Sequence, residues 1–355
     1  MIRKSLNELE GNEVLARNIL TENGAELMTA GTVVRKDYIK RLKELNYEYV
    51  YVRDKDTYID FKQPDYIVKE QLRKESIETV KNVLERHIFK NATDIEKLCK
   101  VADNIIQEVM SEEEIEDQLT NIRKEGNDLY THSINVCSLS SVMGLKWGLD
   151  KKRVTEMAKG SLLHDIGLKY TTISYQNKDE ADMSINDLKE YRKHVINGYN
   201  GIESVKWLSE TAKRIVLLHH ERGDGLGYPF KNHYSELEDE IKIVAICEEF
   251  DSMITGIGRR MYKVYEAIEY MKVHSLEYFD KKLVDMFLQM VAMYPIGTKV
   301  ITSEGDVGIV IKQNKQSPER PVIKIIADKY GNKISNKNKV DLMESLTIFI
   351  VDTYE

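Results

Sequence analysis

Residues 219–229 read HHERGDGLGYP, and residues 162–167 read LLHDIG. In the second stretch a histidine and an aspartate follow two leucines, which predicts that the pair lies at a buried helix end. A neutral imidazole next to a carboxylate can bind one metal ion, and the second carboxylate oxygen can bridge to another. The adjacent pair His219 and His220 would point about 100° apart on a helix, which suits two different ions better than one.

Five of the eight histidines fall within helical patterns in the middle of the chain. A single histidine on an apolar helix face is more often a core or surface residue than a ligand, but five with acidic neighbours favour a metal site. Asp128 is four residues before His132, and Asp251 shares a helix face with Glu248. The five histidines are His132, His164, His194, His219 and His220.

The donor set constrains both the metal and the chemistry. Carboxylates mixed with imidazoles suit iron, manganese or zinc, and the lack of clustered thiolates argues against a structural zinc site. Two ions roughly 3.5–4 Å apart lower the pKa of a bridging water and polarise a phosphoryl oxygen. Hydrolysis of a phosphate ester is therefore the expected reaction.

Helical periodicity dominates from about residue 119 to 293. Spacings of three and four predict one helix through Val136, Leu139 and Met143, and another through residues 208–218. Ser184 to Asp187 resembles a helix-start capping signal. Gly198 and Gly201 lie where a helix could end. An all-α bundle is expected, and such bundles collect metal ligands on facing helices.

The flanking segments differ in character. Residues 1–60 predict a small α/β unit, with a strand over 13–20, a helix over 36–45 and a strand over 47–52. Residues 66–118 are charged and lack proline and glycine, which predicts long helices that pair with a second subunit or pack on the same chain. After Pro295, short β-rich runs at 298–302, 307–312, 322–327 and 346–351 predict a small antiparallel sheet or barrel.

Composition excludes several classes of protein. A hydrophobic fraction of 42% and a charged fraction of 31% are ordinary for a soluble globular protein. No apolar run approaches the ~18 residues of a membrane span, and three scattered cysteines do not suit a disulfide framework. A net charge of −7 argues against a nucleic-acid polymer as partner, although not against a small phosphate substrate. A cytoplasmic location is expected.

The residues quoted above resemble the signature of the HD-GYP family. His164-Asp165 and the string 219–229 carry the resemblance, together with Thr131–Ser133, His194 before Gly198, and Phe250-Asp251. The resemblance implies an all-α HD domain that hydrolyses cyclic di-GMP to the linear dinucleotide pGpG, and onward to GMP in some members. The expected domains are an α/β module at 1–62, connecting helices at 63–118, the catalytic domain at 119–294 and a barrel-like β-rich module at 295–355.

Site roles follow from the resemblance position by position. His164 and Asp165 would be the catalytic pair, and they would hold one metal with His132 and Asp251. Asp165 would bridge to a second ion held by His194 and His219, with His220 at the far side of the centre. Asp128 occupies the position of an acidic ligand to a third ion in some members. Two or three ions, iron or manganese, are therefore expected.

Other matching positions concern the substrate and partners. Arg260 and Lys263 resemble the basic residues of the family's Arg-Pro-Tyr-Arg stretch and are candidates for substrate phosphate; the plainer alternative is a solvated basic helix end. Arg222 is a further candidate. The loop with Asp224, Gly225, Gly227, Tyr228 and Pro229 serves partner recognition in the family; alternatively it is simply a tight turn.

One departure separates this chain from the family pattern. Leu168 stands where the family has a lysine near the substrate phosphate. Lys169 follows it and is a candidate to bind the phosphate in its place. Two other functions therefore compete with the phosphodiesterase. One is a receptor that holds cyclic di-GMP without turnover, and the other is an HD phosphohydrolase of a different nucleotide.

Overall fold

The computed structural model describes residues 2–15, 19–20, 26–28, 32–45, 47, 49–52, 70–84, 92–111, 128–314, 316–332, 334 and 339–354. The chain divides into two units. One contains Pro64–Pro295 and Lys315–Glu319; the other contains Met1–Gln63, Ile296–Asn314 and Arg320–Glu355. The four domain ranges given above stay a prediction beside this division.

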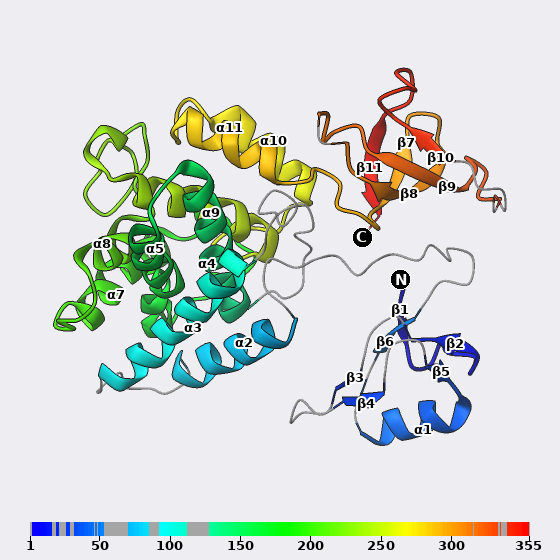
Figure 1. The fold of residues 1–355 in the computed structure, drawn as a ribbon, viewed down its shortest axis with the longest axis horizontal. Coiled ribbons are helices and arrows are strands. Elements are labelled where there is room, and N and C mark those ends of the chain that lie inside the picture. Colours follow the sequence, from blue (N-terminus) through cyan, green and yellow to red (C-terminus); the bar gives the residue numbers. More distant parts are fainter. Residues whose placement is uncertain are drawn as a thin grey trace. The chain divides into compact units, whose positions relative to one another are not determined.

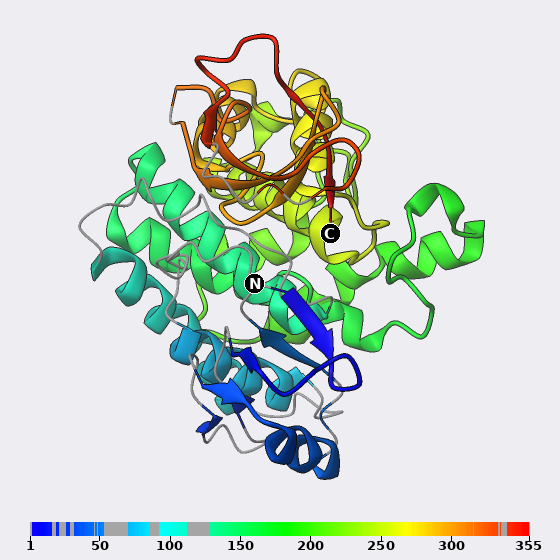
Figure 2. The same cartoon turned by 90° about the vertical axis from the view of Figure 1, so that its right-hand side faces the viewer.

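The unit Pro64–Pro295 is helical, and Figures 1 and 2 show it from two directions. Helix α5 is central in this unit because it packs against α3, α4, α8 and α9. The elements are α2 (Glu70–Leu84), α3 (Ala92–Ser111), α4 (Leu129–Trp147), α5 (Lys151–Leu163), η2 (Ile166–Tyr170), η3 (Glu180–Asp182), α6 (Ile185–Arg192), α7 (His194–Ile202), α8 (Glu210–Leu218), η4 (Tyr234–Glu236), α9 (Asp239–Thr255), α10 (Val264–His274) and α11 (Lys281–Met290).

Helix α4 forms much of the core. Val136, Leu139 and Met143 are buried as their spacing predicts, but most of the other side chains are buried too. A helix that is enclosed on all sides must satisfy its polar groups internally. Ser138 and Ser141 do so by donating to the carbonyls of Ile134 and Cys137, at 2.8 and 2.7 Å.

The charged helices of the 66–118 region pack on the same chain. α2 contacts α3 and α4, and α3 contacts α4 and α5. Their apolar faces include Val80, Val83, Leu98 and Ile105, all buried. Pairing with a second subunit through these helices stays a prediction.

Helix starts follow the sequence better than helix ends. Ser184 caps α6 by accepting from the Asp187 N–H at 3.1 Å, as predicted. α7 ends at Ile202, next to Gly201, whereas the expectation of a helix end at Gly198 is wrong, since Gly198 lies inside the helix. Gly198 is needed for a close approach: a Cβ there would lie 3.3 Å from the Gly167 nitrogen and 3.0 Å from Val216 Cγ1.

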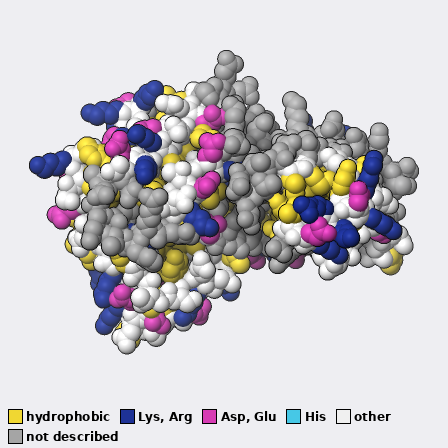
Figure 3. Space-filling view, turned by 90° about the horizontal axis from the view of Figure 1, so that it is seen from below, with side chains coloured by type: hydrophobic (Ala, Val, Ile, Leu, Met, Phe, Trp, Pro, Cys, Tyr) yellow, Lys and Arg dark blue, Asp and Glu magenta, His cyan; other side chains and the backbone are white. Residues whose placement is uncertain are grey.

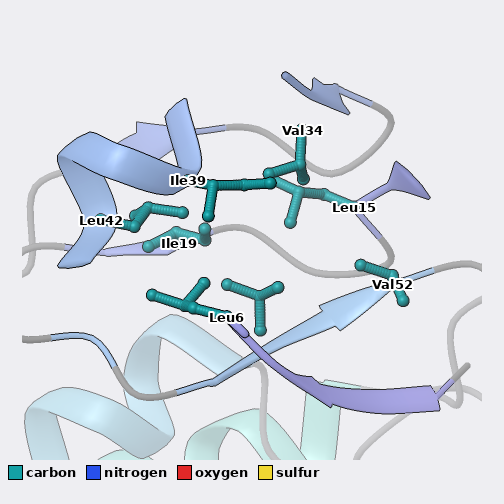
Figure 4. Packing of buried hydrophobic residues seen from close by; sticks show 8 residues of the cluster. Leu6, Leu15, Ile19, Val34, Ile39, Leu42 and Val52 are labelled. Atoms are coloured by element: carbon teal, nitrogen blue, oxygen red, sulfur yellow. The ribbon is translucent and has the colours of Figure 1, made fainter. Parts of the chain in front are cut away.

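The N-terminal part of the other unit contains antiparallel pairs of short strands and one helix. β1 (Ile2–Ser5) pairs with β6 (Tyr49–Val52), β2 (Glu13–Val14) with β5 (Val33–Val34), and β3 (Ile19–Leu20) with β4 (Glu26–Met28). Helix α1 (Lys36–Glu44) buries Ile39 and Leu42 as predicted, against Leu15, Ile19 and Val34 (Figure 4). The strand expected over 13–20 is strand at its two ends, β2 and β3, which pair with different partners; residues 16–18 lie outside the described residues.

A carboxylate organises the turn before β2. Glu13 is buried and accepts backbone N–H groups from Glu10 at 2.9 Å and Gly11 at 3.0 Å. The Lys4 amine lies 3.2 Å from the same carboxylate. Burial alone would raise the pKa of Glu13, but these hydrogen bonds lower it to about 2.

The C-terminal part is a five-stranded antiparallel sheet in the order β10-β9-β8-β7-β11. Its strands are β7 (Lys299–Thr302), β8 (Val307–Lys312), β9 (Val322–Ala327), β10 (Lys339–Asp341) and β11 (Ile350–Tyr354). Three strands match the β-rich runs. The run at 346–351 places the start of the last strand before its observed start at Ile350. Leu346 lies in a turn, with its side chain exposed. The sheet was expected; its closure into a barrel stays a prediction.

Among the described helices, none combines the length and apolarity needed to cross a bilayer. On the face drawn in Figure 3, acidic and basic side chains are mixed, and none of the described histidines is visible there. Four histidines of the site, His132, His164, His194 and His219, are buried, and His220 is partly exposed.

Candidate metal centre

The predicted ligands converge from four helices of the helical unit. His132 comes from α4, His194 begins α7, and His164 and His219 follow directly after α5 and α8. Asp165, beside His164, belongs to two groups of potential metal ligands. One is Asp165 with His132 and His164; the other is Asp165 with His194, His219 and His220. Within each group the ligand atoms lie within 4.8 Å of one another.

The ends of α5 and α8 explain how residues adjacent in sequence reach different places in the metal centre. α8 stops at Leu218 and His219 is its C-cap, so His220 lies in the turn beyond the helix. The expectation that both histidines lie on a helix is therefore wrong for His220. α5 likewise stops at Leu163, and the backbone turns at Asp165 into η2. Because the helices end here, two consecutive side chains can face the same centre.

Each of four imidazoles uses its Nδ1 nitrogen in a hydrogen bond that orients the ring. His164 Nδ1 lies 2.6 Å from the Ser161 carbonyl oxygen, and His194 Nδ1 lies 2.8 Å from that of Tyr191. His219 Nδ1 lies 3.1 Å from the carbonyl oxygens of Ile215 and Val216. His132 Nδ1 lies 2.8 Å from Asp251 Oδ2. Because these partners only accept, each Nδ1 donates, and in the neutral ring each Nε2 keeps a lone pair.

The Nε2 atoms face one another and Asp165. His132 Nε2 and His164 Nε2 are 3.1 Å apart, and His194 Nε2 and His219 Nε2 are 3.4 Å apart. Asp165 Oδ1 lies 3.3 Å from His194 Nε2, and Oδ2 lies 3.4 Å from His164 Nε2. Lone pairs this close repel unless a cation or proton lies between them. The buried atoms Asp165 Oδ1 and His220 Nε2 also have no hydrogen-bond partner. The arrangement fits divalent metal ions.

The electrostatics agree with this donor set. Burial lowers the pKa of His219 to about 4, and burial with neighbouring histidines lowers that of His220 well below its usual range. Both rings are therefore neutral at pH 7. Burial alone would raise the pKa of Asp165, but the nearby imidazoles of His164, His194 and His219 lower it well below its usual range. Asp165 is thus ionised, as a bridging ligand must be.

Two predicted ligands lie outside both groups. Asp251 Oδ2 accepts from His132 Nδ1, and its Oδ1 accepts from Asn135 Nδ2 at 2.9 Å, so this carboxylate lies behind the His132 ring. Asp128 is the N-cap of α4: its Oδ1 accepts from the Tyr130 and Thr131 N–H groups, and its Oδ2 accepts from the Thr131 hydroxyl at 2.9 Å. The structure does not bring either carboxylate into contact with Asp165.

The loop 219–229 folds back on the centre. Gly225 has a φ of +70°, and a Cβ on Gly227 would lie 2.4 Å from the Arg222 backbone nitrogen, so the turn needs a glycine at both positions. The Tyr228 ring stacks on His220 with centroids 4.7 Å apart, and the Tyr228–Pro229 peptide is cis. Asp224 pairs with Arg222 and accepts the Leu226 N–H at 2.9 Å.

Sequence reasoning missed three side chains around this loop. Glu221 is buried and accepts the N–H groups of Phe230 and Asn232, at 2.7 and 2.8 Å. The Arg192 guanidinium lies 4.8 Å from the Tyr228 ring centroid and pairs with Glu180. Only Glu221 carried a signal, as an acidic residue within the motif. Arg192 and Glu180 are 12 residues apart on separate elements, and no local pattern reveals their pairing.

The candidate phosphate-binding residues lie in varied settings. Arg260 is largely exposed, 3.5 Å from Asp179. Arg222 lies 3.5 Å from the Tyr278 ring centroid, and the Lys169 amine lies 4.9 Å from the Tyr170 ring centroid. Lys263 is the N-cap residue of α10. Leu168, at the family's lysine position, is 2% exposed and belongs to the core.

Comparison with family descriptions places two matches on the chain. Residues 109–283 match the family described as HD domain, and residues 300–355 match the KOW domain associated with HD domain. The first match covers all the residues of both ligand groups. The second covers the five-stranded sheet except for the first residue of β7.

The chain is similar to curated phosphodiesterases. It is 28% identical over 210 residues to the cyclic di-GMP phosphodiesterase PA4108 of Pseudomonas aeruginosa, covering 58% of this chain and 50% of that protein. It is 25% identical over 243 residues to the 3'3'-cGAMP-specific phosphodiesterase 2 of Vibrio cholerae, covering 66% of this chain and 45% of that protein. The chain thus spans about half the length of these relatives.

A solved structure shares the fold. Bd1817, a HDG"Y"P protein from Bdellovibrio bacteriovorus, superposes with a TM-score of 0.54 at 18% identity. The match covers 81% of this chain and 98% of that one. At this identity the likeness concerns the fold alone.

Proposed function

We propose that this chain, which belongs to the HD domain family through residues 109–283 and carries the HD-GYP signature, is a metal-dependent phosphodiesterase of cyclic di-GMP. The single observation that carries the proposal is the convergence of lone-pair-bearing Nε2 atoms on the buried, ionised Asp165. A binding protein without metal has no need for such a cluster. The expected product is the linear dinucleotide pGpG, with further hydrolysis to GMP as a second step.

Two divalent ions, iron or manganese, are proposed for the centre, one in each ligand group. Bound there, they supply Lewis acidity and a nucleophilic water for attack on phosphorus. His132 and His164 would hold one, His194, His219 and His220 the other, and Asp165 both. A third ion at Asp128 is the alternative; the capping bonds of Asp128 weigh against it.

The chain's own residues hold this chemistry in place. The Nδ1 hydrogen bonds fix the ring orientations before any ligand arrives, so little reorganisation is needed on binding. The stack of Tyr228 on His220 covers one side of the centre. Arg260, Lys263, Lys169 and Arg222 are proposed to bind the substrate phosphates, since a guanidinium can grip two phosphate oxygens.

Similarity favours a cyclic dinucleotide as the substrate class. The relatives described above are named for cyclic di-GMP and for 3'3'-cGAMP, which share a ring of two phosphodiesters. Cyclic di-GMP is proposed first because it is the substrate that the HD-GYP signature implies. A cytoplasmic location and a protein partner at the 224–229 loop are further proposals that come from the sequence.

The test is purification under anaerobic conditions, metal analysis, and chromatography of the products formed from cyclic di-GMP and from 3'3'-cGAMP. The matched control is the double variant His164→Ala/Asp165→Ala. We expect two metal ions per chain, with pGpG or GMP formed by the wild type only. Preferential cleavage of 3'3'-cGAMP would identify a different cyclic dinucleotide as the substrate and keep the phosphodiesterase activity. Wild-type protein without metal or product would overturn the proposal.

A receptor for cyclic di-GMP is the second candidate. It is favoured by Leu168, because a buried leucine cannot contact a substrate phosphate as the family's lysine does. A metal-loaded protein that binds cyclic di-GMP and leaves it intact would establish this alternative. The third candidate is an HD phosphohydrolase of a different nucleotide. Hydrolysis of a dNTP or an alarmone would establish it.

A further inference from the structure

A row of hydrogen bonds leads from helix α2 to the metal centre. The Arg73 Nη2 atom donates to Asn135 Oδ1 at 2.9 Å. The Asn135 Nδ2 atom donates to Asp251 Oδ1 at 2.9 Å, and Asp251 Oδ2 accepts from His132 Nδ1 at 2.8 Å. Arg73 belongs to α2, His132 and Asn135 to α4, and Asp251 to α9, all within the helical unit.

The amide of Asn135 is chemically matched to its place. It must accept from a guanidinium on one side and donate to a carboxylate on the other, and a primary amide does both. An aspartate at this position would place two carboxylates against each other. An apolar residue of similar size would leave Asp251 Oδ1 without this donor, and Asp251 is fully buried.

The consequence for His132 is a fixed ring. Asp251 holds the Nδ1 proton of His132, which leaves Nε2 as the lone-pair atom facing Asp165 at 3.6 Å. A carboxylate in this position also raises the basicity of the imidazole toward a metal. The orientation of Asp251 is therefore part of the metal affinity, and Asn135 sets that orientation.

We propose that Asn135 and Arg73 are positioning residues of the metal centre, acting on His132 through Asp251. This inference rests on the proposed metal site. It extends the functional unit to α2, upstream of residue 109 where the match to the HD domain begins. Neither residue belongs to the two ligand groups, so we expect their effect to be on metal affinity.

The test measures metal affinity directly, by titrating metal-stripped full-length protein with Mn²⁺ in a calorimeter. Loss of a bond behind a metal-ligating histidine typically weakens metal binding about 10- to 100-fold. We expect a weakening in this range for Asn135→Leu and a smaller one for Arg73→Met. Lys74→Met is the matched control, since it removes a cation from the adjacent, exposed position of α2, and it should bind Mn²⁺ like the wild type.

The double variant Arg73→Met/Asn135→Leu separates positioning from general destabilisation. If Arg73 acts through Asn135, adding Arg73→Met to Asn135→Leu changes the affinity no further. Hydrolysis should recover when Mn²⁺ is raised to saturation, with the KM for cyclic di-GMP unchanged. A merely structural loss would not be restored by metal.

Each outcome decides between the ideas. Additive losses in the double variant, or equal affinities for Arg73→Met and Lys74→Met, would overturn the positioning role and leave the proposed function intact. If the variants lose Mn²⁺ affinity as expected but the wild type hydrolyses no dinucleotide, the proposed function is overturned and the positioning role stands. Wild-type protein that binds no divalent metal would overturn both.

Discussion

At the scale of single residues, metal binding depends on which nitrogen of each imidazole carries the proton. Burial alone would lower the pKa of His164, but the charges of Asp165 and Asp251 raise it above its ordinary value. His219, with a pKa of about 4, stays neutral in the same pH range. In the metal-free protein, His164 therefore keeps its ring proton to a higher pH than His219 does.

This difference predicts a pH dependence of metal affinity. A metal must displace the His164 proton, so Mn²⁺ affinity should fall as the pH is lowered through the raised pKa, by up to about tenfold per pH unit for one proton. Titrations of the wild type at several values between about pH 8 and 6 would show the slope. An affinity that does not change over this range would contradict the assignment.

Asp128 gives a second residue-scale prediction. The Asp128→Ala variant loses the capping hydrogen bonds at the start of α4. This should cost about 1 kcal/mol of stability and leave the number of bound metal ions unchanged. Asp128→Ser is the control, because serine caps a helix well but is a poor metal ligand. Chemical denaturation and metal analysis give the two readouts. Loss of one ion in both variants would instead establish Asp128 as a ligand to a third metal.

At the scale of elements, the start of α7 is fixed by its contact with η2. A Cβ on Gly167 would lie 1.9 Å from the His194 carbonyl oxygen and 2.7 Å from the Gly198 nitrogen. No side chain fits this space, and the obstructing atoms are backbone. The position of His194 in the metal centre therefore depends on the absence of a side chain at Gly167.

Gly167→Ala should push α7 away from η2, with a loss of stability of roughly 1–3 kcal/mol and weaker metal binding. Gly201→Ala, within α7, is the matched control, since an added Cβ there has no atom within 4 Å. That variant should keep its metal and gain about 0.5–1 kcal/mol, because alanine favours a helix. Thermal unfolding and metal analysis would test both. Equal stabilities for the two variants would show that α7 shifts to accommodate the Cβ at position 167 without loss.

The elements also show what sequence can predict. The bundle, the strand runs after Pro295 and the convergence of His132, His164 and His194 follow from periodicity and motif. The roles of Asp251 and Gly198 do not, because a carboxylate behind a ring and a glycine at a helix contact depend on partners in other elements, at least 18 residues away in the chain. Spacing identifies which residues meet but not which atom of each faces the centre.

At the scale of the whole molecule, both ligand groups lie in one of the two units. The other unit contains Glu13, whose pKa is lowered to about 2 by the Glu10 and Gly11 N–H groups and by Lys4 against the effect of burial. A carboxylate with a lowered pKa stabilises the fold above its unfolded-state pKa, and this contribution is lost as the pH falls toward about 2.

Glu13→Gln should therefore destabilise the N-terminal part by about 1–3 kcal/mol at pH 7, since hydrogen bonds to a charged acceptor are lost. Hydrogen exchange at the Glu10 and Gly11 amides would report this loss. The difference from the wild type should shrink in acid. Metal content should stay that of the wild type; a drop in bound metal would show that the two units are energetically linked.

The sharing of Asp165 between unequal ligand groups affects how the protein fills with metal. One side of this carboxylate offers three imidazoles and the other offers two. In the proposed two-ion centre, the three-imidazole side would fill first, and an ion there would draw electron density from Asp165 and weaken it as a donor for the second ion. Cells short of metal would then contain a half-loaded form, so the supply of iron or manganese, as well as the abundance of the protein, would set how much of it is active.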